Sequence, residues 1–197
     1  MTSREVFFNT PAAKRARIRQ VPIMWTYEDE GILYPHEDAL VIEVTAANKM
    51  FDQILVDTGS SVDVLFKSTL EEMRITDLRL EHINTSLKGF GRGKLVPLGV
   101  VELSITIDSS PTEKTMILDF VVVDEEGLCQ MILGRPFLRM SKAVLSNHYL
   151  VLKYQANGVV GVVPGDWRIA RSCYSTTERQ TMQITSLDTR VGARNGR

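Results

Sequence analysis

The sequence is poor in cysteine and histidine, which limits the kinds of site that it can build. It has two cysteines, Cys129 and Cys173, and three scattered histidines. Two cysteines make no disulfide framework, and neither residue type shows the spacing of a metal site. We therefore expect reduced thiols in a cytoplasmic protein, with no bound metal and no cofactor.

Long apolar runs and an excess of one charge are also missing. No apolar stretch approaches the length of a membrane span, and the N-terminus lacks the apolar stretch of a signal peptide. The net charge is −1 over 197 residues, so the overall charge points to no polyanionic partner. The hydrophobic content of 44% is ordinary for a globular core. We expect one domain with tails, no membrane partner and no nucleic-acid partner.

The most informative stretch is residues 53–61, where an apolar run leads straight into an acid, a hydroxyl and a glycine. Residues 54–56 show no polar alternation, so we expect a strand that is covered on both faces. Asp57 at its end would be costly as a lone carboxylate unless it is hydrogen-bonded or shares its charge. Thr58 and Gly59 follow, and on their own these three residues also fit an ordinary turn after a strand.

A second motif gives the first one its meaning. Residues 131–134 read Met-Ile-Leu-Gly, and Arg135 follows. The chain thus has an apolar run that ends in Asp-Thr-Gly and, later, an apolar run that ends in Gly-Arg. With these two motifs in this order, it resembles the aspartic proteases of the retroviral type, the retropepsins. The sequence is more similar still to plant gypsy-type LTR retrotransposon polyproteins, at residues 35–42, 57–66, 132–136 and 165–174. The resemblance covers roughly residues 30–175.

The resemblance implies a fold class and a domain organisation. The fold would be all-β and mainly antiparallel, a closed, barrel-like half of an acid protease with one short C-terminal helix. Residues 1–34 would be a disordered linker with basic and acidic parts, and residues 35–156 the retropepsin-like domain. Residues 157–197 would be a C-terminal extension, partly a disordered linker toward a reverse transcriptase. Within this region, residues 156–164 read as an apolar, Gly-rich link.

The local patterns predict short strands and two short helices. Apolar or alternating runs predict strands at residues 39–44, 54–56, 62–66, 101–107, 116–123 and 131–134, and a strand pair within 144–154. Residues 49–51 lead into the strand at 54–56. Helical spacing predicts a short helix at residues 67–73. A second short helix is expected at residues 136–140, because proline is well placed at a first helical position.

Residues 87–95 contain three closely spaced glycines between predicted strands. A phosphate-binding loop is excluded by its context, because no helix N-terminus follows. A hairpin tip fits better, and in the retropepsins this position is the flap that closes over the substrate. The resemblance therefore implies substrate contacts for Gly89, Phe90 and Gly91. For Phe90, ordinary packing under the hairpin is an equally good interpretation.

The resemblance assigns the other site residues. In the retropepsins, the arginine that corresponds to Arg135 pins the domain by a salt bridge near the active-site loop. Ser61 lies where retroviral proteases often have an acid, so Asp63 is a candidate partner for Arg135, although strand alternation argues against it. The implied catalytic residues are Asp57, Thr58 and Gly59, the implied substrate contacts nearby are Ser60 and Ser61, and the implied structural supports are Gly134 and Arg135.

The chain has a single usable Asp-Thr-Gly motif. The dipeptide Asp188-Thr189 is followed by Arg190 and has no β-run before it, so we reject it. Aspartic protease chemistry needs two carboxylates, one as base toward water and one as acid toward the scissile carbonyl. One motif per chain supplies this pair only by two-fold symmetry, with Asp57 facing its copy. We therefore expect a homodimeric aspartic endopeptidase that cleaves a Gag-Pol-like polyprotein, inside a virus-like particle when the element is intact.

Two other interpretations stay open. In the first, the chain is a retrotransposon remnant that dimerises as an interaction module without cleaving, although the intact residues 57–59 argue against decay of the active site. In the second, the basic residues between Lys14 and Arg19 bind nucleic acid or direct nuclear import. A linker is the favoured interpretation of this tract, because no aromatic residues are interleaved with the charges.

Overall fold

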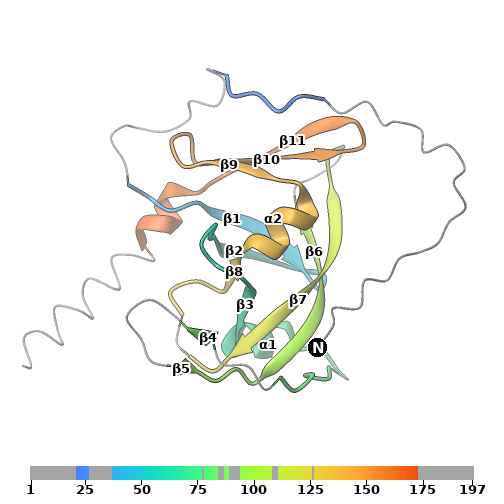
Figure 1. Ribbon diagram of the computed structural model, residues 1–197, viewed down its shortest axis with the longest axis vertical. Coiled ribbons are helices and arrows are strands. Elements are labelled where there is room, and N and C mark those ends of the chain that lie inside the picture. The colour runs from blue at the N-terminus through green and yellow to red at the C-terminus, as the bar shows by residue number, and fades with distance from the viewer. Residues whose placement is uncertain are drawn as a thin grey trace, which may run out of the picture.

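Six strands close into a barrel at the centre of the computed structural model (Figure 1). The structure describes residues 21–26, 37–76, 78–83, 87–88, 94–107, 111–125 and 127–172. Around the barrel the strand order is β1-β2-β8-β3-β7-β6. The strands are β1 (Val41–Ala46), β2 (Lys49–Val56), β3 (Asp63–Phe66), β6 (Gly99–Ile107), β7 (Lys114–Val123) and β8 (Met131–Leu133).

Two antiparallel hairpins build most of the barrel wall. β6 pairs with β7 in continuous register from Gly99 to Ile107, and alternate residues of β6 face the core, as a period of two requires. β1 and β2 are joined at Ala47 and Asn48, which have φ angles of 47° and 69°. Two successive positive φ angles are typical of the tight turns whose twist matches that of a hairpin.

The order of the remaining strands determines where the Asp57 loop lies. β8 is inserted between β2 and β3, parallel to β2 and antiparallel to β3, and β3 is parallel to β7. The chain from β2 to β3 must therefore cross the end of β8. Residues 57–62 make this crossing, so the loop meets the residues that follow β8.

The core fills the barrel and extends under both short helices. Phe120, Leu65 and Phe137 are among the largest fully buried side chains, and Phe137 belongs to α2 (Arg135–Ser141). A smaller cluster of Val64, Val121 and Val123 packs with Leu95. Leu95 ends the short hairpin of β4 (Leu87–Lys88) and β5 (Lys94–Leu95). The other helix, α1, spans Lys67–Met73.

A second, three-stranded sheet follows the barrel and corrects one prediction. Its order is β11-β10-β9, with β9 at Val144–Ser146, β10 at Val151–Ala156 and β11 at Val159–Pro164. Residues 156–164 were expected as a link, yet β11 pairs with β10 along its whole length. The turn between them is Asn157-Gly158, with φ angles of 52° and 83°. Asn-Gly between β-forming residues is a strong hairpin signal that outweighs the glycine content.

Residues 21–26 also differ from the disordered linker predicted for residues 1–34. They lie along β10, where Lys153 Nζ donates to the Met24 carbonyl oxygen at 2.7 Å and Gln155 Nε2 to that of Val21 at 2.9 Å. The Trp25 ring stacks on Tyr149 and lies 5.0 Å from the Lys153 ammonium. The aromatic contacts of Trp25 and two hydrogen bonds from β10 side chains to its backbone hold this segment, which we call the N-terminal strap.

After β11 the chain folds back to the start of β1. The Gly165 and Asp166 N–H groups donate to the carbonyl oxygens of Leu150 and Val41, and residues 167–172 are helical. Arg171 makes hydrogen bonds of 3.1 Å to both carboxylate oxygens of Asp38. Because the guanidinium group and the carboxylate match in geometry, this pair ties the C-terminal helical turn to the segment before β1 that lines the candidate site.

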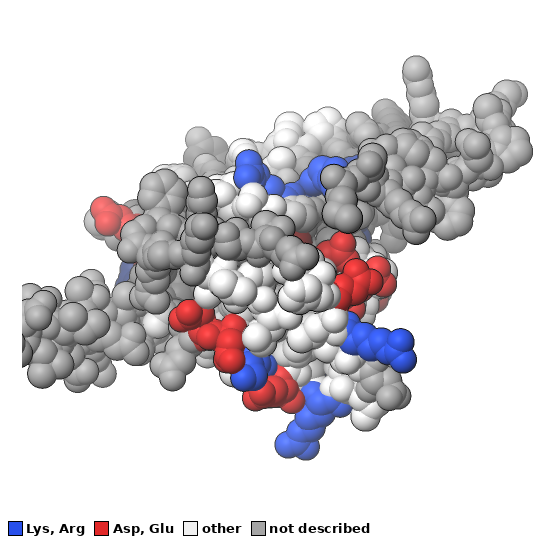
Figure 2. Space-filling view, turned by 60° about the horizontal axis from the view of Figure 1, so that its bottom comes forward, with Lys and Arg blue, Asp and Glu red and all other residues white. Residues whose placement is uncertain are grey.

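The fold class predicted from the sequence is confirmed: the structure is mainly antiparallel β with a closed barrel and a short helix, α2, after its last strand. The helix predicted at residues 67–73 is also present. On the face in Figure 2, lysines and arginines are interspersed with aspartates and glutamates around an uncharged centre. In the part of the chain that the structure describes, no helix is long and apolar enough to cross a membrane.

Candidate active site

β2 places Asp57 at the rim of the barrel. The last residue of β2, Val56, is buried and donates its N–H to the Leu40 carbonyl oxygen at 2.9 Å. The Asp57 N–H donates to the Leu133 carbonyl oxygen, also at 2.9 Å. The Asp57 backbone is therefore still part of the sheet, while its half-buried side chain has left the core.

The Asp57 carboxylate has a hydrogen-bond partner within its own loop. The Gly59 N–H donates to Asp57 Oδ1 at 2.8 Å, which meets the requirement that a carboxylate at a strand end be hydrogen-bonded. Gly59 has no side chain, and a Cβ there would lie 3.1 Å from the same oxygen. Thr58 and Ser61 are exposed.

The polar groups of Ser60 are used inside the protein. Its hydroxyl donates to the Val62 carbonyl oxygen at 2.6 Å. Its carbonyl oxygen accepts from the Arg135 N–H at 3.0 Å and from Arg135 Nε at 3.2 Å. The loop is thus closed on itself on one side and held by the start of α2 on the other.

Gly134 lies where the two motifs meet. A Cβ added to it would lie 3.0 Å from the Ser60 carbonyl oxygen and would collide with that of Val62. Both are backbone atoms, so a side chain could enter only if the loop moved. The close approach explains why a glycine follows β8.

Arg135 contacts the loop in a way that the sequence did not indicate. In the described residues it forms no salt bridge, and its guanidinium group reaches a backbone carbonyl oxygen of the loop instead. The candidate partner Asp63 is completely buried and accepts hydrogen bonds from the N–H groups of Gly134 and Phe137. The Arg135–Asp63 pair considered from the sequence is therefore wrong, because Asp63 faces into the fold beneath α2.

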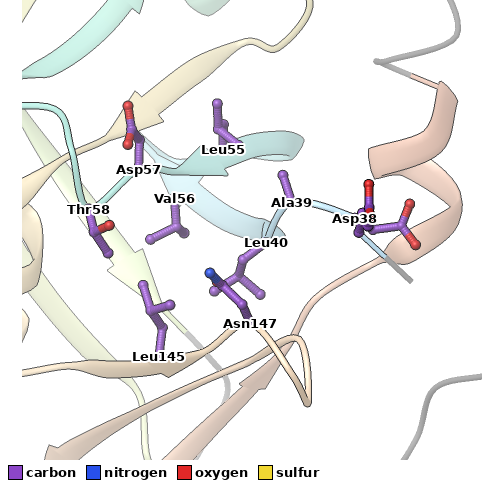
Figure 3. A pocket seen from close by; sticks show the side chains of 10 residues that line it. Asp38, Ala39, Leu40, Leu55, Val56, Asp57, Thr58, Leu145 and Asn147 are labelled. Carbon is purple, nitrogen blue, oxygen red and sulfur yellow. The ribbon is translucent and has the colours of Figure 1, made fainter. Parts of the chain in front are cut away.

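A hollow of about 520 Å³ opens beside Asp57 (Figure 3). Asp57 and Thr58 lie at one side of it and Asp38 at the other, with Leu145 and Asn147 along the lower edge. Leu145 belongs to β9 and Asn147 follows it. No sequence pattern points to these two residues, because they lie about 90 positions beyond Asp57 and show no motif.

The structure brings together the two motifs that the sequence singled out. Asp57 bonds to Leu133, and Ser60 contacts Gly134 and Arg135, so the loop that also carries Thr58 and Gly59 is joined to the second motif. The other predicted contacts, Gly89, Phe90 and Gly91, lie outside the described residues. Their flanking strands β4 and β5 pair as the predicted hairpin requires. Across the described residues, no group of three histidine, cysteine or acidic side chains could hold a metal ion.

Comparisons with known proteins give structural similarity only. No family model matches the sequence, and no curated protein matches it. The structure is similar to the retroviral protease-like domain of Ddi1 from Leishmania major, with 14% identity, 68% of this chain and 95% of that chain covered, and a TM-score of 0.49. It is also similar to EIAV protease in complex with an inhibitor, with 21% identity, coverage of 58% and 99%, and a TM-score of 0.43. A retropepsin-like aspartic protease from Rickettsia conorii shows 19% identity, coverage of 62% and 79%, and a TM-score of 0.40.

Proposed function

We propose that this chain is an aspartic endopeptidase that works as a homodimer, with Asp57 of each copy forming the catalytic pair. The observation that carries the proposal is the Asp57 loop itself. A single Asp-Thr-Gly sequence ends a barrel strand, and its carboxylate is half-exposed beside a hollow and fixed by the Gly59 N–H. One such loop per chain makes half of a two-carboxylate site.

In the proposed reaction the two Asp57 carboxyl groups share one proton. The ionised group takes a proton from the attacking water, and the protonated group donates to the carbonyl oxygen of the scissile peptide bond. Two carboxylates at close range do not both ionise readily, which favours the singly protonated pair. The Gly59 N–H bond to Asp57 Oδ1 keeps the carboxyl group oriented while the proton moves.

The proposed substrate is an extended polypeptide. An extended backbone pairs with protein edges as an added strand, and the β4–β5 hairpin is positioned by Leu95 on the cluster of Val64, Val121 and Val123. We propose that residues 89–93 form its tip and close over the substrate as a flap. From the resemblance of the sequence to plant gypsy-type retrotransposon polyproteins, we further propose a retrotransposon polyprotein as the natural substrate.

The test is a cleavage assay with the purified full chain. The substrate is a Gag-Pol-like polyprotein, incubated with and without a pepstatin-type inhibitor, and fragments are identified by mass spectrometry. The proposal predicts discrete fragments that disappear with the inhibitor and are absent with Asp57→Asn. Asp52→Asn is a matched control, since Asp52 is an exposed aspartate of the same strand. Fragments that persist in Asp57→Asn would rule the proposal out. A folded dimer that makes none would favour the silent interaction module.

A further inference from the structure

Asp63 is a buried carboxyl group that the proposed reaction does not use. It is the first residue of β3 and is 0% exposed. Its Oδ1 accepts from the Gly134 N–H at 2.6 Å and from the Phe137 N–H at 3.4 Å. Its Oδ2 is also buried and has no hydrogen-bond partner among the described residues. A buried carboxyl group with one oxygen unpaired is costly, so its presence calls for a reason.

The residue that Asp63 holds is the centre of the support under the Asp57 loop. Gly134 lies between Leu133, whose carbonyl oxygen accepts the Asp57 N–H, and Arg135, whose N–H and Nε donate to the Ser60 carbonyl oxygen. The bond from Gly134 to Asp63 therefore fixes the backbone between these two attachments. A shift of Gly134 would move both ends of the loop that carries Asp57.

The surroundings of Asp63 make its protonation state sensitive to pH. The pKa of Asp63 is raised to about 6. Burial is the main cause and the charge of Asp119 on β7 adds to it, whereas the N–H groups of Gly134 and Phe137 act in the opposite direction. The other charged residues on neighbouring elements are Lys114 on β7, Arg135 and Arg139 on α2, Asp57 in the loop, and Lys67, Glu71 and Glu72 on α1, while β8 carries none. Lys114 bonds to the Ser141 and Gln155 carbonyl oxygens.

We propose that Asp63 is a positioning residue for the Asp57 loop: its carboxyl group holds the Gly134 backbone and, through Leu133 and Arg135, sets the position of Asp57. The inference rests on the proposed function for its catalytic consequence, and on geometry alone for its structural one. An asparagine at this position keeps an acceptor for the Gly134 N–H and resembles the protonated acid in shape. An alanine removes the acceptor.

The first test follows the backbone directly and needs no catalytic activity. Amide signals of the 15N-labelled full chain are recorded from pH 4 to 8 for wild type, Asp63→Asn and Asp119→Asn. In wild type, the Gly134, Asp57 and Ser60 amides are expected to shift together with a midpoint near pH 6. The common shift should vanish in Asp63→Asn and persist in Asp119→Asn with a slightly lower midpoint. Asp57 and Ser60 amides that stay still while Gly134 titrates would overturn the inference.

The second test asks whether the support matters for cleavage. For Asp63→Ala we expect kcat to fall on the order of 10–100-fold, with KM changed less than about two-fold, because the catalytic group is displaced while the substrate contacts remain. Asp63→Asn should restore most of kcat and remove the step near pH 6 from the rate profile. Equal losses in Asp63→Ala and Asp63→Asn would overturn the inference. If wild type cleaves nothing, the proposed function fails, and the amide titration still decides about Asp63.

Discussion

Asp57 and Asp63 lie six positions apart, and the structure treats them in opposite ways. Asp57 follows the end of β2, is half-buried, and accepts one hydrogen bond from the next turn of its own loop. Asp63 begins β3, is fully buried, and accepts from two N–H groups at the start of α2. A carboxyl group that reaches solvent can meet water and substrate directly, whereas a fully buried one acts on the protein groups around it. The difference supports the proposed catalytic role of Asp57 and the proposed positioning role of Asp63.

The largest effect is expected from a substitution of Asp57, the carboxyl group proposed to take part in the reaction. Asp57→Asn should reduce cleavage about a thousand-fold or more, because the shared-proton pair is lost. The half-exposed site should keep its stability within about 0.5 kcal/mol. Initial rates with a peptide substrate and chemical denaturation check the two parts. Normal rates in this variant would show that the carboxylates of the reaction lie elsewhere.

The raised pKa of the buried Asp63 predicts that the stability of the protein depends on pH. Because folding raises the pKa of Asp63 from 3.8 to about 6, its contribution to stability is fully present below pH 3.8 and is lost as the pH rises through 6. The loss amounts to about 3 kcal/mol, at about 1.4 kcal/mol for each pKa unit. Denaturation of wild type and Asp63→Asn from pH 4 to 8 measures it as the change in their difference. A constant difference between the two proteins would contradict a titration of Asp63 in this range.

A change at the residue between the two carboxyl groups sharpens the comparison. Gly134→Val places a side chain against the backbone of Ser60 and Val62, and we expect a loss of about 1–3 kcal/mol of stability from overpacking. Cleavage should fall as well, because the collision displaces the loop. Ser61→Ala, at an exposed position of the same loop, is the control for loop substitutions in general. An unchanged melting temperature would mean that the loop moves aside without cost.

The smallest effect is expected far from both carboxyl groups, in the N-terminal strap. Trp25→Ala removes the stacking on Tyr149 and the contact with the Lys153 ammonium. We expect a loss of about 0.5–2 kcal/mol in stability and no change in kcat. Thermal unfolding and initial rates measure the two. A large loss of activity would show that the strap acts on the site.

The sequence predicted much of the local structure around Asp57 because strand, turn and helix signals act over short distances along the chain. Residues 54–56 form a strand by composition, Gly59 leaves room for the Asp57 carboxylate, and Gly134 is required by a close approach of the loop backbone. The short helices followed from spacing at residues 67–73 and from Pro136 near the start of α2. In the strand and the helices the residue types favour the conformation locally, whereas Gly134 is required by the backbone of Ser60 and Val62, more than 70 positions away.

What the sequence did not predict depends on contacts between distant segments. The direction of the Asp63 side chain is determined by α2, about 70 positions later. Leu145 reaches the hollow because β9 folds back beside the loop, and residues 21–26 are held by contacts with Tyr149 and β10. The β10–β11 hairpin could have been predicted, since Asn157-Gly158 between two β-forming runs is a turn signal. Its glycines were read as a link.

The central claim is that one active site takes Asp57 from two chains, and the most direct measurement of it is specific activity over a wide dilution range. Sedimentation at the same concentrations and pH reports the fraction of dimer. The account predicts that specific activity falls in proportion to the dimer fraction, since a monomer carries one carboxyl group of the pair. Specific activity that stays constant down to concentrations at which sedimentation detects only monomer would contradict it.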